Sequence, residues 1–277
     1  MPPADQTRAD LLAEPDWLEA HSDDRSVRII DTRSAESYAA GHIPGAVPLG
    51  AHPWLKSTAD PLQIAGPREF AALMGGLGVG NDMSVVAYSD NSGLTAARLW
   101  WVLRAYGHRD AKVLDGGWEH WINGGRPVST EPATPAAAHF EPHPDDRATC
   151  GLDDLRDGLA DGSLQVLDVR GDGEWTGAAN PHENSRVGHL PGARHLEWTA
   201  LVDPARGGVF RSDREIRERL EAAGIGPGTV VTHCQAAVRA AHTAFALALA
   251  GRDAVRVYDG SMAEWSRHAD APLVAGT

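Results

Sequence analysis

Three sequence motifs occur twice in this chain, in the same order. The segment VRIIDTRSAESYAAGHIPGAVPL is matched further on by LQVLDVRGDGEW and RVGHLPGARHL. SVVAYSDNSGLTAARLWWVL is matched by TVVTHCQAAVRAAHTAFALAL, and VLDGGWEHW is matched by VYDGSMAEW. The offset runs from 137 positions (Asp31 to Asp168) to 147 positions (His42 to His189), far longer than the repeats of about 20–45 residues that build solenoids. The sequence therefore predicts a duplicated domain.

The duplication also predicts where the domains begin and end. We expect an N-terminal domain over residues 1–130, a linker over 131–147 and a C-terminal domain over 148–277. A chain of 277 residues is long enough for two domains of ordinary size. The segment between the copies, STEPATPAAAHFEPHPDDRA, is rich in proline and alanine, which is typical of an extended linker.

Composition argues against several classes of protein. The formal net charge is −13, which argues against a surface that binds nucleic acid. No segment approaches the run of about 18 apolar residues that a membrane-spanning helix needs, since the longest candidate, after Cys234, carries Arg239 and His242. Two cysteines do not make a disulfide framework. We therefore expect a protein of the reducing cytoplasm that binds neither nucleic acid nor membrane.

Strand patterns alternate with helix patterns in the second copy. Ser212 and Glu215 match a capping box at the start of a helix, and Gly224 suits its end. We expect strands at 165–169, 229–232 and 255–258, and helices at 212–224, 240–250 and 261–268. This alternation predicts an α/β fold, in which each copy forms a mainly parallel sheet flanked by helices on both faces. Ligands of such sheets bind at the carboxyl ends of the strands.

Cys234 follows one of these predicted strands and precedes a helix. The first turn of a helix leaves backbone N–H groups unpaired and carries partial positive charge, so it favours an anion. Arg239 adds a permanent positive charge five positions further on. An ordinary thiol is mostly protonated at neutral pH, and a nucleophilic cysteine needs surroundings of this kind. Cys234 is therefore a candidate nucleophile; the alternative is a buried structural cysteine.

Taken together, the duplicated Asp-x-Arg strand end, the Gly-His-Ile/Leu-Pro-Gly-Ala turn and the cysteine loop resemble the tandem rhodanese family of sulfurtransferases. The resemblance covers nearly the whole chain. It implies two rhodanese-like domains with one active cysteine, in the C-terminal copy. The first copy has Ser89 where the paired motifs place Cys234, and an alcohol ionises far less readily than a thiol, so we expect the N-terminal domain to be catalytically inactive.

The resemblance also implies a reaction. The thiolate of Cys234 would attack the outer sulfur of a small anionic donor such as thiosulfate, release sulfite and keep a persulfide. An acceptor, which is cyanide, a thiol or a reduced thioredoxin-like protein, would then remove that sulfur. No metal or organic cofactor is implied. The anion-binding loop would consist of the residues that follow the cysteine: Gln235, Ala236, Ala237, Val238 and Arg239.

Two positions depart from the family pattern. The loop matches Cys-x-x-Gly-x-Arg except that Ala237 replaces glycine, which is costly if this position needs a positive φ. Glu174 stands where family members often have arginine, and a carboxylate facing the pocket would repel a dianionic donor. The candidates for restoring positive charge at the substrate are three arginines of the second copy: Arg170, Arg186 and Arg194.

The identity of the donor and two rival functions stay open at this level. Relatives that use 3-mercaptopyruvate usually read Cys-Gly-Ser-Gly-Val-Thr, so the loop favours thiosulfate. A phosphatase or arsenate reductase would separate its cysteine and arginine by five residues, whereas Cys234 and Arg239 are separated by four. A non-catalytic module that binds partners or senses redox state is the third alternative, and the Ala237 and Glu174 departures support it.

Several other polar residues have structural interpretations. Asp31 and Asp168 end the same strand in both copies, so we expect their carboxylates to accept N–H bonds from the loops that follow. His233 adjoins Cys234 but should point to the opposite face of the sheet. Cys150 has no comparable helix start or arginine and is interpreted as incidental.

Overall fold

The computed structural model describes residues 6–50 and 54–276, and these group into two compact units. The first unit extends as far as Asp145 and includes the segment Asp203–Phe210. The second consists of Asp146–Val202 and the chain from Arg211 onward. The segment expected to be a linker, residues 131–147, contains no helix or strand, and its backbone donates hydrogen bonds to the first unit, from Ala138 to Gly75 among others.

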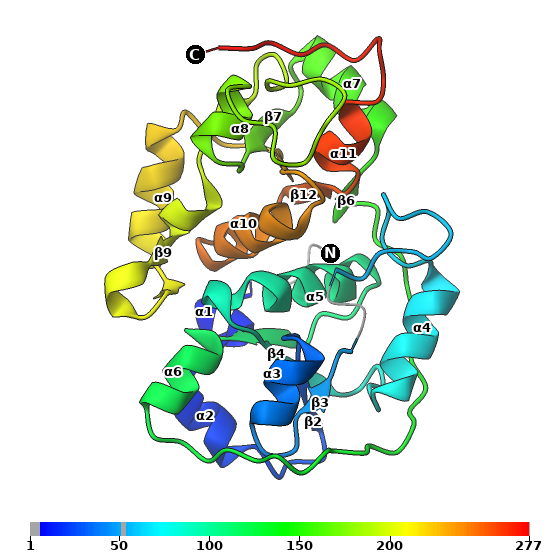
Figure 1. The fold of residues 1–277 in the computed structure, drawn as a ribbon, viewed down its shortest axis with the longest axis vertical. Helices are drawn as coiled ribbons and strands as arrows, with labels where there is room; N and C mark the ends of the chain where they lie inside the picture. Colours follow the sequence, from blue (N-terminus) through cyan, green and yellow to red (C-terminus); the bar gives the residue numbers. More distant parts are fainter. Residues whose placement is uncertain (1–5, 51–53, 277) are drawn as a thin grey trace. The chain divides into compact units, whose positions relative to one another are not determined.

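Each unit is built on a five-stranded parallel sheet, and the strand order is the same in both. Figure 1 shows the helices and strands of both units as a ribbon. The first sheet has the order β1-β5-β4-β2-β3, and its strands are β1 (Leu12–Ala13), β2 (Val27–Asp31), β3 (Val47–Pro48), β4 (Ser84–Tyr88) and β5 (Ala111–Leu114). The second sheet has the order β6-β12-β11-β7-β8, and its strands are β6 (Thr149–Cys150), β7 (Gln165–Asp168), β8 (Arg194–His195), β11 (Val230–His233) and β12 (Val255–Tyr258). The short strands β9 (Val202–Asp203) and β10 (Val209–Phe210) form a separate two-stranded sheet. The predicted parallel α/β fold is confirmed.

Helices connect the strands in both units. The described helices of the first unit are α1 (Arg8–Leu11), α2 (Pro15–Ala20), α3 (Ala35–Ala40), α4 (Pro67–Gly76), α5 (Leu94–Ala105) and α6 (Gly117–Asn123), with the 3-10 turn η1 (Asn91–Gly93). The remaining helices are α7 (Leu152–Asp161), α8 (Asp172–Thr176), α9 (Asp213–Ala222), α10 (Val238–Leu249) and α11 (Ser261–Trp265), with the 3-10 turns η2 (Trp198–Leu201) and η3 (Pro204–Arg206). Among the described residues, no helix is long and apolar enough to cross a membrane.

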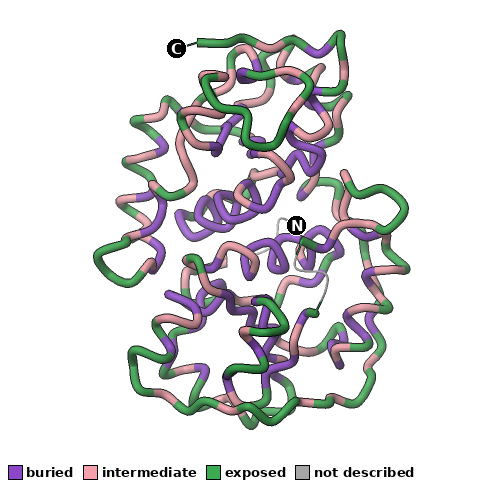
Figure 2. The backbone as a smooth tube through the Cα atoms, in the orientation of Figure 1, coloured by how far each residue is buried: buried purple, intermediate pink, exposed green. Residues whose placement is uncertain are grey.

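Alternation along β11 places the two faces of the second sheet against different helices. Thr232 donates from its hydroxyl to the carbonyl of Ala240 on α10 (3.0 Å), so this face meets α10. Val231 lies on the other face, in an apolar cluster with Leu155 of α7 and Trp265 of α11. Figure 2 shows that α10 is buried along its length. The central strands are therefore covered on both sides, which explains their nearly continuous apolar sequence.

The local predictions for the second copy hold to within a few residues. Ser212 caps α9 and forms the predicted capping box with Glu215. The strand expected at 255–258 is β12, and those expected at 165–169 and 229–232 are β7 and β11. The last helix, α11, ends earlier than expected, at Trp265, before a turn held by hydrogen bonds from Arg267 to Glu264 and from His268 to Trp265.

A buried Asp–Arg pair ends the same strand in both sheets. Asp31 accepts a hydrogen bond from the backbone N–H of Arg33 (2.9 Å) and forms an ion pair with its guanidinium (2.6 Å). Asp168 does the same with the backbone of Arg170 (3.0 Å) and its side chain (2.6 Å). The predicted role of these carboxylates as acceptors of loop N–H bonds is confirmed.

Each of these arginines also holds the turn of the Gly-His-x-Pro-Gly-Ala motif. The Nη2 of Arg33 donates to the carbonyl of Gly41 (2.7 Å), and the Nη2 of Arg170 donates to that of Gly188 (2.8 Å). The separations are 8 and 18 residues, so the second copy holds ten extra residues within this loop. We call the Asp–Arg pair together with the bond from its arginine to the turn the Asp–Arg clamp. Both units have this clamp, but the loop that it closes is longer in the second unit.

We predict that Asp31→Asn lowers the free energy of unfolding of the first unit by about 3–5 kcal/mol, because the guanidinium of Arg33 is left buried without its anion. Hydrogen exchange of the β2 and β4 amides measures the change. The control is Asp16→Asn, whose exposed carboxylate also pairs with an arginine, Arg126, and which should cost at most about 1 kcal/mol. Equal effects of the two substitutions would contradict the account.

Candidate functional site

Cys234 lies where β11 ends and the loop into α10 begins. Its backbone N–H donates to the Oγ of Ser261 (3.2 Å), and its carbonyl accepts from the N–H of Met262 (3.1 Å). Ser261 in turn donates to the carbonyl of Tyr258 (2.8 Å). The residue is 1% exposed. The loop is therefore fixed at the cysteine by the start of α11 and the end of β12.

Ser261 is a positioning contact that sequence reasoning did not identify. It has a φ of 50° and corresponds in the VYDGS motif to Gly117 of VLDGG, which has a φ of 57°. The sequence did contain a signal for this contact: the second copy has a serine where the first has glycine, at a position with a positive φ. Its hydroxyl gives the second unit a contact to the loop that glycine cannot make.

Arg239, in the first turn of α10, binds Glu174 through both carboxylate oxygens. The distances are 2.6 Å from Nη1 to Oε2 and 3.0 Å from Nη2 to Oε1. Burial lowers the pKa of Arg239, but hydrogen bonds and charge from Glu174 and Cys234 outweigh burial and raise it above its ordinary value. The guanidinium therefore contacts both the carboxylate of Glu174 and the side chain of Cys234.

Glu174 projects from α8 toward the cysteine loop. Besides Arg239, it accepts a hydrogen bond from the backbone N–H of Gly171 (3.4 Å), and the ring of His182 lies 3.7 Å away. Burial alone would raise the pKa of this carboxyl. The hydrogen bonds and charge of Arg239 outweigh burial, so the pKa of Glu174 lies below its ordinary value. Glu174 is thus ionised at neutral pH. The structure brings this departure from the family pattern into contact with the site.

Ala237 occupies the left-handed region predicted to be costly for a residue other than glycine. It is buried and caps α10 with φ 61° and ψ 4°. The corresponding cap of α5 in the first unit is Gly93, with φ 80°. An alanine in this region costs about 1–2 kcal/mol relative to an ordinary helical conformation. The condition under which alanine is costly at this position, a positive φ, is therefore met.

Gln235 is held by the ten extra residues of the second copy. Its side-chain amide and that of Asn184 exchange two hydrogen bonds, each 2.9 Å long. Ser185 anchors the same segment by donating to the carbonyl of Ser266 (2.6 Å). The first copy lacks these ten residues. The contacts of Asn184 and Ser185 beside the cysteine loop are therefore specific to the second unit.

The three candidate arginines lie in different surroundings. Arg170 is buried in its pair with Asp168, and Arg194 is exposed on β8 beside Gly224. The guanidinium of Arg186 donates to four backbone carbonyls around the end of α11: Trp265, Ser266, His268 and Ala271. Binding of substrate by these arginines stays a prediction, and Arg239 is the cation that contacts the cysteine.

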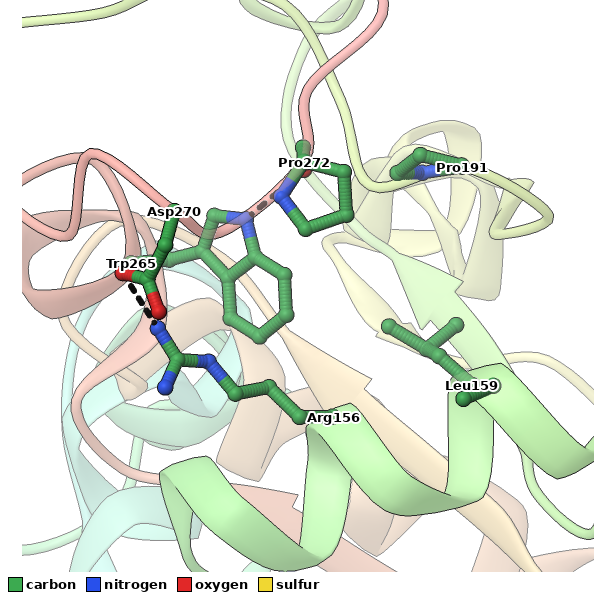
Figure 3. A pocket seen from close by; sticks show the side chains of 7 residues that line it. Arg156, Leu159, Pro191, Trp265, Asp270 and Pro272 are labelled. Atoms are coloured by element: carbon green, nitrogen blue, oxygen red, sulfur yellow. Dashed lines mark hydrogen bonds and ion pairs between the residues drawn. The ribbon is translucent and has the colours of Figure 1, made fainter.

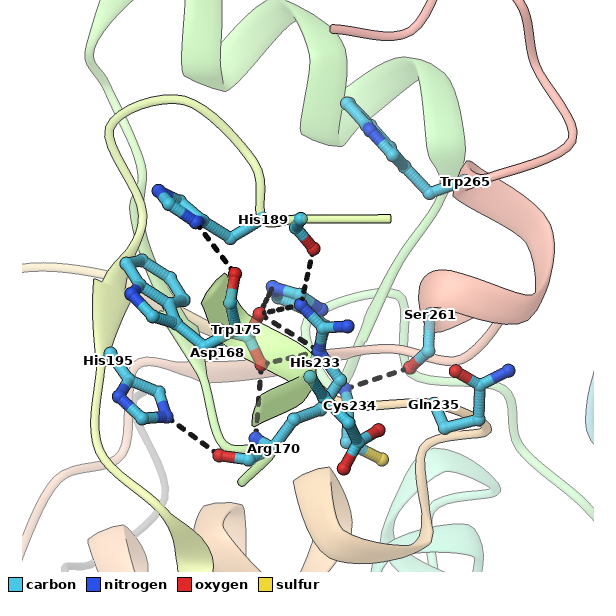
Figure 4. Close-up of polar contacts among 12 residues, drawn as sticks. Asp168, Arg170, Trp175, His189, His195, His233, Cys234, Gln235, Ser261 and Trp265 are labelled. Carbon is cyan, nitrogen blue, oxygen red and sulfur yellow. Dashed lines mark hydrogen bonds and ion pairs between the residues drawn. The ribbon is translucent and has the colours of Figure 1, made fainter. Parts of the chain in front are cut away.

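A buried polar cluster lies behind the cysteine. The Nε2 of His233 is 3.6 Å from Asp168, and neither ring nitrogen has a hydrogen-bond partner among the described residues. Burial lowers the pKa of His233, so its ring is neutral at pH 7. Burial alone would raise the pKa of Asp168, but the hydrogen bonds and charge of Arg170 outweigh burial and leave this pKa below its ordinary value. Figure 4 shows the Asp168–Arg170 pair on one side of Cys234, with Ser261 and Gln235 on the other.

The first unit has the same strand order but different side chains at the positions of Cys234 and Arg239. Sheet register pairs Asp31 with Tyr88, as it pairs Asp168 with His233, so Ser89 is the counterpart of Cys234. Thr95, the second residue of α5, stands where α10 has Arg239. The candidate nucleophile and the arginine that contacts it are therefore both absent from these positions of the first unit.

Two other features of the second unit lie outside the cysteine loop. Burial raises the pKa of Cys150 on β6 to about 11, which keeps that thiol protonated. A hollow of about 340 Å³ is lined by Trp265, Pro272 and an Arg156–Asp270 ion pair (Figure 3). The lining residues that the structure describes include none from the cysteine loop.

Sequence comparisons with known proteins find the same domain in both halves of the chain. A model of the rhodanese-like domain matches residues 14–123 and again 151–268. The sulfur carrier protein TtuD of Thermus thermophilus is 33% identical, over 96% of this chain and 97% of that protein. A protein of Mycolicibacterium smegmatis, whose name proposes a thiosulfate sulfurtransferase, is 32% identical over 98% of this chain and 99% of its own.

Solved structures with similar folds cover both units. SseA from Escherichia coli, described as a 3-mercaptopyruvate sulfotransferase with the rhodanese fold, has a TM-score of 0.82 at 27% identity, over 92% of this chain and 99% of its own. An anaerobic ergothioneine biosynthesis enzyme from Chlorobium limicola has a TM-score of 0.87 at 22% identity, over 98% of this chain and 71% of its own. The second likeness concerns the fold alone.

We predict that Ala237→Gly raises the free energy of unfolding of the second unit by about 0.5–1 kcal/mol, because glycine relieves the left-handed strain but adds freedom to the unfolded chain. Hydrogen exchange of the α10 amides measures it. The matched control is Ala236→Gly, one position earlier where φ is negative, which should destabilise the unit by about 0.5–1 kcal/mol. A loss of stability in both variants would show that strain at Ala237 is negligible.

Proposed function

The chain belongs to the rhodanese family of sulfurtransferases, and we propose that it moves a sulfane sulfur from thiosulfate to a thiophilic acceptor through a persulfide on Cys234. The observation that carries this proposal is the contact between the side chains of Cys234 and Arg239, which lies in the first turn of α10. This contact exists in the second unit only, since the first has Ser89 and Thr95 there.

The first half-reaction is a displacement at sulfur. The thiolate of Cys234 attacks the outer sulfur of thiosulfate, a new S–S bond forms, and the S–S bond to the sulfite group breaks. Sulfite leaves with the electron pair, and the total charge is unchanged. In the second half-reaction cyanide, a thiol or a reduced thioredoxin-like protein attacks the outer sulfur of the persulfide and regenerates the thiolate, which completes a ping-pong cycle.

The loop supports the anion at each stage. The N-terminus of a helix as long as α10, which has twelve residues, stabilises an adjacent negative charge by about 0.3–1 kcal/mol, and by up to about 2 kcal/mol when partly buried. Arg239 adds a charged hydrogen bond, which is stronger than a neutral one. Because Cys234 is 1% exposed, binding of the donor includes a local opening at the loop.

Thiosulfate is the donor that we propose, and 3-mercaptopyruvate is the alternative. The loop reads Cys-Gln-Ala-Ala-Val-Arg and not the Cys-Gly-Ser-Gly-Val-Thr usual among mercaptopyruvate-specific relatives. The name of the Mycolicibacterium smegmatis relative supports thiosulfate. The structural likeness to SseA supports the alternative.

The two rival functions have less support. A phosphate-binding loop would need one more residue between its cysteine and arginine than this loop has. A module without catalytic function would not need a cation beside its cysteine, yet Arg239 lies there. Phosphate-ester turnover that exceeds sulfite release would favour the first rival, and an unreactive Cys234 that controls binding of a partner would favour the second.

We predict that thiosulfate adds the mass of one sulfur atom to the wild-type chain and releases sulfite, and that Cys234→Ser abolishes both. The matched control is Cys150→Ser, which should keep the sulfur addition because its thiol stays protonated in the fold. Intact-mass spectrometry and a sulfite assay measure the outcome, first with thiosulfate and then with 3-mercaptopyruvate. Equal sulfur addition in the wild type and in Cys234→Ser would refute the mechanism.

A further inference from the structure

We propose that Glu174 sets the charge preference of the sulfur-transfer site. By binding Arg239, its carboxylate disfavours dianionic donors such as thiosulfate relative to sulfane donors that carry one negative charge, which include alkyl thiosulfonates and alkyl persulfides. This inference rests on the proposed function, because it concerns which donor the same cysteine accepts.

The geometry commits the guanidinium of Arg239 to Glu174. Both carboxylate oxygens are bonded, at 2.6 and 3.0 Å, and the side chains of Arg239 and Glu174 are 20% and 12% exposed. An ion pair with this little exposure is weakly screened by solvent. The positive charge of Arg239 is therefore already balanced by the carboxylate of Glu174 before a donor binds.

The other candidate arginines are held in contacts of their own or lie on the surface. Arg170 is matched by Asp168 at 2.6 Å, and Arg186 is surrounded by backbone carbonyls of the segment after α11. Arg194 is exposed and packs beside Gly224. With the thiolate of Cys234, Arg239 and Glu174 carry a net charge of −1, and this charge repels a dianion about twice as strongly as a monoanion at the same position.

The Glu174–Arg239 pair is not one of the features that the two units share. The offset of 137 residues aligns Glu174 with Ser37 of the first unit, and Thr95 stands in place of Arg239. The first unit forms the same sheet and the same Asp–Arg clamp without this pair. The carboxylate therefore occurs where a sulfur donor would bind and not where the fold alone would need it.

The test compares two donors that differ by one charge. Thiosulfate is a dianion, and methanethiosulfonate replaces one of its oxyanions by a methyl group while transferring the same outer sulfur and releasing methanesulfinate. The quantity measured is the ratio of kcat/KM for thiosulfate to kcat/KM for methanethiosulfonate. We expect Glu174→Gln, which keeps the shape of the side chain, to raise this ratio at least tenfold.

Two further variants make the result specific. Arg239→Gln leaves the carboxylate unpaired and should lower the same ratio at least tenfold, so the proposal is testable even if Glu174→Gln folds poorly. Glu218→Gln removes one negative charge from an exposed ion pair with Arg214 on α9, and it should leave the ratio unchanged. This control separates a local charge effect from a change in the net charge of the protein.

Each remaining outcome overturns a stated part of the account. If Glu174→Gln lowers both values of kcat/KM by the same factor, Glu174 only holds Arg239 in place and the charge preference is wrong. If the wild-type protein takes sulfur from neither donor, the proposed function fails, and this inference fails with it. A normal wild-type rate with an unchanged ratio in the variants refutes the inference alone.

Discussion

The parallel pairing of β11 with β7 determines where the chemistry of the second unit lies. Thr232 pairs with Leu167 and His233 with Asp168, so both strands end at the same edge of the sheet. The cysteine loop leaves β11 at that edge, and α8, which carries Glu174, follows β7 there. A slip of one residue would turn every side chain of the strand to the opposite face and would separate Arg239 from Glu174. The ion pair beside the cysteine is therefore a consequence of sheet register.

The two units show which residues the fold needs and which the chemistry needs. Both have the strand order, the buried Asp–Arg clamp and a left-handed residue at the cap of a twelve-residue helix. Only the second has a thiol, a cation and a carboxylate together at the end of its central strand. The first unit thus has the shared architecture without these three side chains. In the other, the glycine cap has been exchanged for Ala237, so strain is stored where the proposed nucleophile is held.

Much of this architecture could be predicted from the sequence because its signals are local. The repeated motifs, the capping box at Ser212 and the strained position of Ala237 each depend on neighbouring residues. The pairing of Arg239 with Glu174 could not be predicted, since it joins side chains 65 positions apart and depends on how α8 is oriented. The contact of Ser261 with the loop depends on the same kind of long-range packing. The amide pair of Gln235 depends on ten inserted residues for which the first copy offers no template.

The measurement that tests the central claim most directly follows a single labelled sulfur. The protein is treated with thiosulfate that carries a heavy isotope in its outer position only, digested under non-reducing conditions and analysed by mass spectrometry. The account predicts one labelled sulfur on the peptide that contains Cys234, and labelled thiocyanate when cyanide is added before digestion. A label on the peptide that contains Cys150, or labelled thiocyanate without any labelled protein, would contradict a persulfide on Cys234 as the intermediate.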